Sequence, residues 1–146
     1  MSARAVIDSV EFARSRQVLR GRVPLAEFAR LRDSLYNTDG ALEFELRGGS
    51  DARERLRLRL SVAGELKLAC QRCLGRLDFA LAADADLLVL TAAGAGEEVG
   101  YEDLDGVPAN PRTDVWTLVE DEALLALPLS PRHVEGSCGP AVRAST

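Results

Sequence analysis

The segment RLRLRLSVAGELKLACQRCLGRLDFALAADADLLVL, residues 55–90, decides the fold because its apolar residues recur at every second position. Before the cysteines, one parity holds Leu56, Leu58, Leu60, Val62, Leu66, Leu68 and Cys70, with Gly64 in the same series. After the cysteines, it holds Leu77, Phe79, Leu81, Ala83, Ala85, Leu87 and Val89. Alternate side chains of a strand share one face, and a glycine can permit a bend or a close backbone approach. The pattern predicts two long antiparallel strands that reverse at CQRCLG.

Similar patterns extend the prediction to both sides. ALEFELRG, residues 41–48, alternates as a third strand, and the following GGSD predicts a turn back into residues 53–60. VLRGRV, residues 18–23, is a shorter strand candidate, and the helical spacing after Pro24 predicts a helix over residues 24–37. Residues 94–112, rich in acids, glycine and proline, predict an exposed loop.

The strongest predicted helix is TDVWTLVEDEALLALP, residues 113–128, which Thr113 or Asp114 can cap and Pro128 ends. Together these segments predict a single α+β domain over residues 1–146, with residues 139–146 as a flexible tail. Its sheet is expected to be mainly antiparallel, could curl into a partial barrel, and carries two principal helices packed on it.

Charge is divided unevenly along the chain. Residues 1–76 contain 15 Lys and Arg against 10 Asp and Glu, whereas residues 77–146 contain 3 against 13, within a net charge of −5. The division fits two different partner surfaces or an ordinary solvated exterior. Because no apolar run reaches 18 residues and the N-terminus lacks a signal-peptide pattern, we expect a cytoplasmic protein without a membrane contact.

Four arginines of one parity form a possible partner surface: Arg53, Arg55, Arg57 and Arg59. Such a row suits a phosphate backbone or an acidic peptide. Alternatively, Glu43 and Glu45 pair with Arg57 and Arg55 across the GGSD turn and neutralise half of it. Aromatic residues make up only 5% of the chain, so base stacking is not expected to dominate any contact with RNA.

The cysteine turn raises the question of a metal. Cys70 and Cys73 have the spacing of half a zinc site, and His133 and Cys138 offer the other soft or imidazole ligands. The alternative is that the two cysteines are small apolar residues of the core. A thioredoxin-like redox pair is disfavoured, since that motif opens a helix and this one lies between two strands.

No pattern in the sequence supports catalysis. His133 lacks a recognisable nucleophile and orienting partner, and no glycine-rich phosphate loop occurs. We therefore expect a non-enzymatic protein without a small-molecule substrate. Glu120, Asp121 and Glu122 place three carboxylates in mid-helix. In an alternative reading, the acidic C-terminal half docks a basic protein and does not touch RNA.

Two motifs carry a resemblance to a known family. LACQRCLGRLDF, followed by an acidic loop and VEDEALLALPLSPRHVEGSC, resembles the YceD family over roughly residues 5–138. The resemblance implies a role in the synthesis, processing or stability of large-subunit (23S) ribosomal RNA, with ribosomal RNA or ribosome-assembly proteins as partners. It suggests a metal at the cysteines, with zinc as the candidate. Many relatives end in a second C-x2-C, whereas this chain ends in SCGPAVRAST, which favours a vacant site.

The expected site residues follow from the row, the turn and the resemblance. The metal candidates are Cys70, Cys73, His133 and Cys138. The candidates for contact with RNA or another partner are Arg53, Arg55, Arg57, Arg59, Arg72 and Arg76, and the acidic partner-binding candidates are Glu120 and Glu122.

Overall fold

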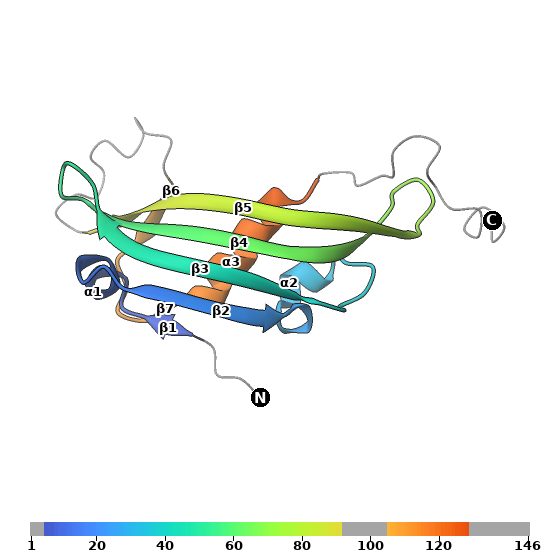
Figure 1. Cartoon of the computed structure of the whole chain (residues 1–146), viewed down its shortest axis with the longest axis horizontal. Coiled ribbons are helices and arrows are strands. Elements are labelled where there is room, and N and C mark those ends of the chain that lie inside the picture. Colours follow the sequence, from blue (N-terminus) through green and yellow to red (C-terminus); the bar gives the residue numbers. More distant parts are fainter. Residues whose placement is uncertain (1–4, 92–104, 129–146) are drawn as a thin grey trace.

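The computed structural model describes residues 5–91 and 105–128 of the chain. Its main feature is an open, five-stranded sheet in the order β2-β3-β4-β5-β6. The strands are β2 Val18–Pro24, β3 Ala41–Ser50, β4 Leu56–Ala69, β5 Arg76–Leu90 and β6 Asp105–Pro108. In Figure 1 they form a long curved layer, with α2 and α3 behind it and α1 at one end.

The strands β4 and β5 confirm the two long strands expected around the cysteines. They pair antiparallel from Arg57 opposite Leu88 to Ala69 opposite Arg76. β4 continues through Gly64 without a break, so the parity of its buried leucines is the same on both sides. A Cβ on Gly64 would lie 2.7 Å from the carbonyl oxygen of Ala41, so glycine permits a close approach of β3 at this point.

The sheet is mixed and does not close into a barrel, which corrects the option of a partial barrel. β5 and β6 run parallel, with Leu87 opposite Asp105, while the other strand pairs in this sheet are antiparallel. The predicted loop over residues 94–112 is wrong at residues 105–108, which form β6, and confirmed at residues 109–112, which are exposed and belong to no strand or helix. Residues 92–104 lie outside the described ranges.

A second, two-stranded sheet joins distant parts of the sequence. β1, Val6–Ile7, pairs antiparallel with β7, Thr113–Asp114. α3, Val115–Ala126, follows directly, and the Asp114 side chain accepts hydrogen bonds from the N–H groups of Trp116 and Thr117. The predicted helix and its cap are therefore confirmed, and none of the described helices is long and apolar enough to span a membrane.

The helix predicted over residues 24–37 is wrong in its extent. The structure has a 3-10 turn, Leu25–Glu27, and a short α2, Ala29–Arg32, separated by Phe28 in an extended conformation. Phe28 is 1% exposed and packs against Trp116 at 6.3 Å between ring centroids. Burial of this ring favours the break over one continuous helix. A further helix, α1 Ser9–Arg14, lies in a region where no helix was predicted.

The core lies between the inner face of the sheet and the helices. It contains the inward leucines of β3, β4 and β5 together with Phe12, Phe28, Leu31, Val115, Trp116 and Val119. This packing leaves the opposite face of the sheet to charged and small side chains. The ends of the strands therefore position most of the candidate site residues.

Candidate nucleic-acid interface

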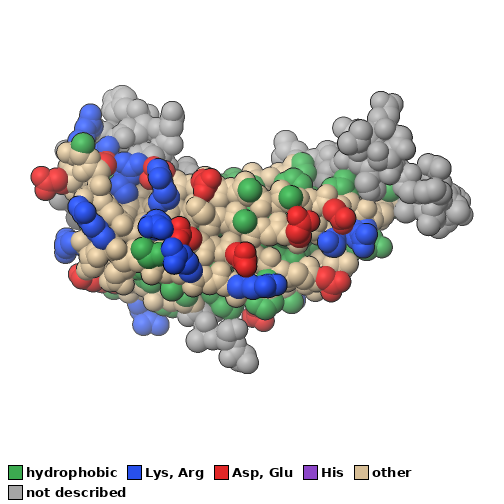
Figure 2. All heavy atoms as spheres, viewed as in Figure 1, with side chains coloured by type: hydrophobic (Ala, Val, Ile, Leu, Met, Phe, Trp, Pro, Cys, Tyr) green, Lys and Arg blue, Asp and Glu red, His purple; other side chains and the backbone are tan. Residues whose placement is uncertain are grey.

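Arginines gather at one end of the sheet. Figure 2 shows Lys and Arg side chains crowded at the left, where Figure 1 places α1 and the loop between β3 and β4. We call this group the basic end and define it by six residues: Arg14, Arg16, Arg53, Arg55, Arg57 and Arg59. The predicted arginine row supplies four of them, but Arg53 and Arg55 belong to the loop because β4 begins only at Leu56.

The side chain of Asp51 organises this loop. Its Oδ1 accepts the backbone N–H groups of Arg53 and Arg55 at 2.9 and 3.0 Å. Its Oδ2 accepts hydrogen bonds from Arg55 Nε and Arg57 Nη1, each at 2.9 Å. Burial opposes ionisation of Asp51, but these hydrogen bonds outweigh it and hold the pKa of the carboxyl well below its usual range.

A second carboxylate, Asp86 on β5, holds the arginines of β4. The Arg57 guanidinium meets both oxygens of Asp86, with Nη2 2.8 Å from Oδ2, and Arg59 Nη2 lies 3.4 Å from the same oxygen. The hydrogen bond to Asp86, and then that to Asp51, raise the pKa of Arg57 against the cost of burial. These two acids therefore neutralise much of the predicted row.

The expected pairing of Glu43 with Arg57 and of Glu45 with Arg55 is wrong. Glu43 lies opposite Ala63, and Glu45 lies opposite Ser61 and binds Arg20 and Arg47 at 2.6 and 2.9 Å. The register differs because β3 does not turn at GGSD.

Gly48 explains why β3 runs on to Ser50. A Cβ on this residue would lie 2.3 Å from the carbonyl oxygen of Phe12, so only glycine lets β3 pass against α1. Gly48 therefore serves the packing of β3 on α1, and the turn follows the strand at residues 51–55.

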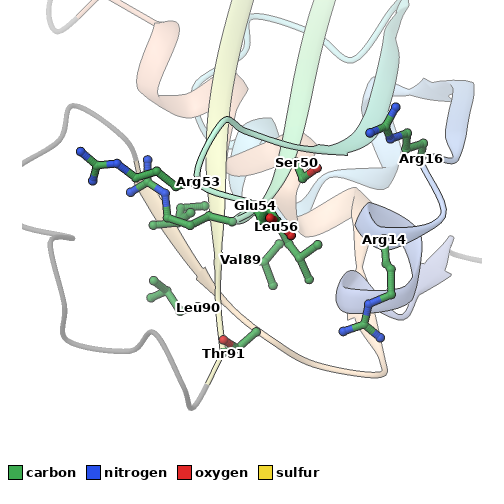
Figure 3. A pocket seen from close by; sticks show the side chains of 11 residues that line it. Arg14, Arg16, Ser50, Arg53, Glu54, Leu56, Val89, Leu90 and Thr91 are labelled. Atoms are coloured by element: carbon green, nitrogen blue, oxygen red, sulfur yellow. The ribbon is translucent and has the colours of Figure 1, made fainter.

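A hollow of about 560 Å³ lies at the basic end, between α1, the loop and the end of β5. In Figure 3, Arg53 lies on one side, Arg14 and Arg16 lie on the other, and Leu56 and Val89 lie between them. We call it the arginine groove. Arg14 and Arg16 were not among the predicted site residues, although the basic run RSR, residues 14–16, was an available signal.

The remaining arginine candidates lie elsewhere. Arg72 is in the turn between β4 and β5, and Arg76 begins β5 and lies 3.3 Å from Asp78. Since Arg76 is opposite Ala69, ten residues along β4 from Arg59, the two groups are separated by about 33 Å of strand. The structure does not bring Arg72 and Arg76 to the basic end.

The cysteine turn is a hairpin turn, as predicted. The Cys70 N–H donates to the Gly75 carbonyl at 2.9 Å, and the Leu74 N–H donates to the Cys70 carbonyl at 2.7 Å. Cys70 is fully buried and Cys73 is half-buried, and neither forms a disulfide. Among the described residues no group of three or more potential metal ligands gathers, and His133 and Cys138 lie outside the described ranges.

The two acidic candidates have different surroundings. Glu120 is 7% exposed, and its Oε2 accepts the N–H groups of Arg30 and Leu31 at 2.8 and 2.9 Å. It therefore fastens the start of α2 to α3, which leaves it little access to a partner. Glu122 is half-buried and lines a separate hollow of about 600 Å³ with Asp121, Leu118 and Leu125.

The fold defines an α+β protein with an open, mixed sheet and helices packed on one face. A family model described as large ribosomal RNA subunit accumulation protein YceD matches residues 58–145, more than half of the chain. The chain belongs to the YceD family, which confirms the resemblance of its motifs. Comparisons with curated proteins and with solved structures gave no match.

Proposed function

We propose that the protein is a non-enzymatic factor in the synthesis, processing or stability of large-subunit (23S) ribosomal RNA. The description of its family supplies the link to accumulation of this RNA. The basic end supports direct contact with RNA, because arginines from α1, a loop and β4 gather there in a chain whose net charge is −5. A local basic surface can attract a polyanion even when the whole protein is acidic.

The chain is proposed to act as one domain over residues 1–146. The pairing of β1 with β7 supports this, because it joins the start of the chain to the strand that leads into α3. The tail proposed for residues 139–146 lies outside the described ranges.

Deletion of the gene tests the function. Mature large-subunit ribosomal RNA should fall relative to small-subunit RNA, with accumulation of precursor particles, and the wild-type gene should restore the ratio. The expected absence of catalysis predicts no cleavage of precursor RNA by the purified protein. An unchanged ratio across growth temperatures would contradict the proposed function.

A second candidate function is a protein-interaction module. The observation that favours it is the hollow beside α3, where Leu118 and Leu125 lie next to Asp121 and Glu122, and where Leu125 is 75% exposed. Apolar residues beside carboxylates suit a basic amphipathic segment. Parallel pulldowns with the wild-type protein and with Leu125→Asp would test this candidate. The substitution should abolish capture of a specific protein partner without altering RNA binding.

A further inference from the structure

We propose that the arginine groove binds the phosphodiester backbone of an RNA strand through Arg14, Arg16 and Arg53. The inference rests on the proposed function and adds the surface and the part of the RNA that it contacts. It also moves the centre of binding from the predicted row on β4 to a groove that combines α1 with the β3–β4 loop.

Ion pairs are distributed unevenly over the arginines of the basic end. Arg57 is held by both Asp51 and Asp86, and Arg59 lies near Asp86. By contrast, within residues 5–91 and 105–128 the side chains of Arg14 and Arg16 form neither a hydrogen bond nor an ion pair, and both residues are exposed. The strongest electrostatic attraction for a polyanion at this end therefore comes from the arginines of α1 and of the turn after it.

The shape of the arginine groove also favours an extended strand. The guanidinium groups of Arg14, Arg16 and Arg53 do not point toward one common centre in Figure 3 but lie apart around the groove. This spread suits successive phosphates of a strand better than a lone phosphate ion. The described lining residues include no aromatic side chain on which a base could stack, which favours contact through the RNA backbone.

Backbone hydrogen bonds fix one wall of the groove without any ligand. The turn after α1 is held by four backbone hydrogen bonds, including Gly48 N–H to the Gln17 carbonyl at 2.8 Å and Gln17 N–H to the Phe12 carbonyl at 3.1 Å. Arg16 has φ of 53°, a conformation that favours glycine. A non-glycine residue with such a φ, beside a basic groove, agrees with a binding role.

Glu54 provides a matched control on the same groove. It has φ of 60° and the opposite charge, and it also lines the hollow. Arg16→Gly and Glu54→Gly should therefore both preserve the backbone, while they change the electrostatic potential of the groove in opposite directions. Arg32→Gln, on the exposed end of α2, removes one positive charge away from the groove.

The test measures binding of the full chain to a labelled oligouridylate by fluorescence anisotropy over a range of salt concentrations. Arg16→Gly should weaken binding about two- to fivefold, the effect of one exposed charge contact. It should also reduce the slope of log K against log salt by about 0.7. Glu54→Gly should strengthen binding by a similar factor, and Arg32→Gln should have little effect. Thermal unfolding should show that the variants remain folded.

Several outcomes would overturn the groove. Equal weakening by Arg16→Gly and Arg32→Gln would mean that only net charge matters. If inorganic phosphate displaces the RNA when its concentration equals that of the RNA phosphates, the groove is a site for a lone ion. If polyglutamate displaces the RNA when it carries the same total charge as the RNA, the groove is a site for an acidic peptide. Absence of RNA binding at low salt would reject the groove but not the deletion phenotype. Conversely, groove-dependent binding with an unchanged RNA ratio in the deletion strain would reject only the proposed function.

Discussion

The two ends of β4 are held by different kinds of contact. The β3–β4 loop depends on one side chain, Asp51, which accepts hydrogen bonds from two backbone N–H groups and two guanidinium groups. The β4–β5 turn is closed by backbone hydrogen bonds between Cys70 and its neighbours Leu74 and Gly75. The comparison indicates that one substitution can disorganise the basic end, whereas the hydrogen bonds that close the cysteine turn are made by the backbone, so the main cost of a substitution there should come from the burial of Cys70 or from a bound metal.

The largest expected effect is that of Asp51→Ala. It removes the acceptor for both N–H groups and leaves Arg55 and Arg57 without this carboxylate, so we expect a loss of about 2–3 kcal/mol in the free energy of unfolding. Asp51→Asn retains an oxygen for the N–H groups of Arg53 and Arg55 and should cost less. Urea denaturation measures both variants, and equal stabilities for the two would show that the backbone contacts do not matter.

The second-largest expected change in stability comes from substitution of the turn cysteines, Cys70→Ser and Cys73→Ser. We expect zinc well below one equivalent per chain, because the relatives' second C-x2-C is missing. In that case only Cys70→Ser should destabilise the protein, by about 1–2 kcal/mol, since it buries a hydroxyl at a fully enclosed position.

Metal analysis after growth with added zinc decides this point. One zinc per chain, lost in both variants together with comparable destabilisation, would identify a real site. Pro128, the last described residue, lines a hollow with Gln71, and His133 follows five residues later, within about 17 Å of extended chain. Elemental analysis of His133→Ala would then show whether that residue contributes.

A third prediction uses pH. The pKa of Asp51 is lower in the folded protein than its usual value, so its contribution to stability is complete above about pH 4 to 5 and is lost as the pH falls toward the folded-state pKa. Stability of the wild-type protein should therefore decline more steeply in this acidic range than that of Asp51→Asn. Parallel curves for the two proteins, from urea denaturation at each pH, would contradict the ionised network.

The smallest expected effect is that of Leu74→Gly in the cysteine turn. Leu74 has φ of 62° and is 72% exposed, so glycine relieves backbone strain but adds freedom to the unfolded chain. The two effects oppose each other, and the stability should change by no more than about 0.5 kcal/mol. Leu74→Val places a branched Cβ at the same φ and should unfold at a clearly lower temperature than the wild-type protein.

The strand alternation explains why so much of the fold was predictable. Burial of one face over the whole of β4 and β5 leaves a regular signal in the sequence, and the same parity on both sides of Gly64 identified one continuous strand. Asp114 and Pro128 similarly marked the two ends of α3 within a residue or two. These features depend on local geometry and on one dominant burial pattern.

The features that the sequence did not reveal depend on contacts between distant segments. GGSD predicts a turn directly after residue 47 because the close approach of Phe12, which keeps Gly48 in β3, is a tertiary contact. The break at Phe28 likewise depends on Trp116 and on the capping carboxylate of Glu120. For the candidate site, parity placed Arg57 and Arg59 together but could not show that Asp86 would neutralise them.

The pairing of β1 with β7 has a consequence for the order of folding. Residues 6–7 meet residues 113–114, so this small sheet can form only after nearly all of the chain is available. Closing so large a loop costs more entropy than zipping the β4–β5 hairpin, which needs only its own short turn. During synthesis we therefore expect the hairpin to form first and the N-terminal strand to dock last, which would complete the placement of α1 only at the end.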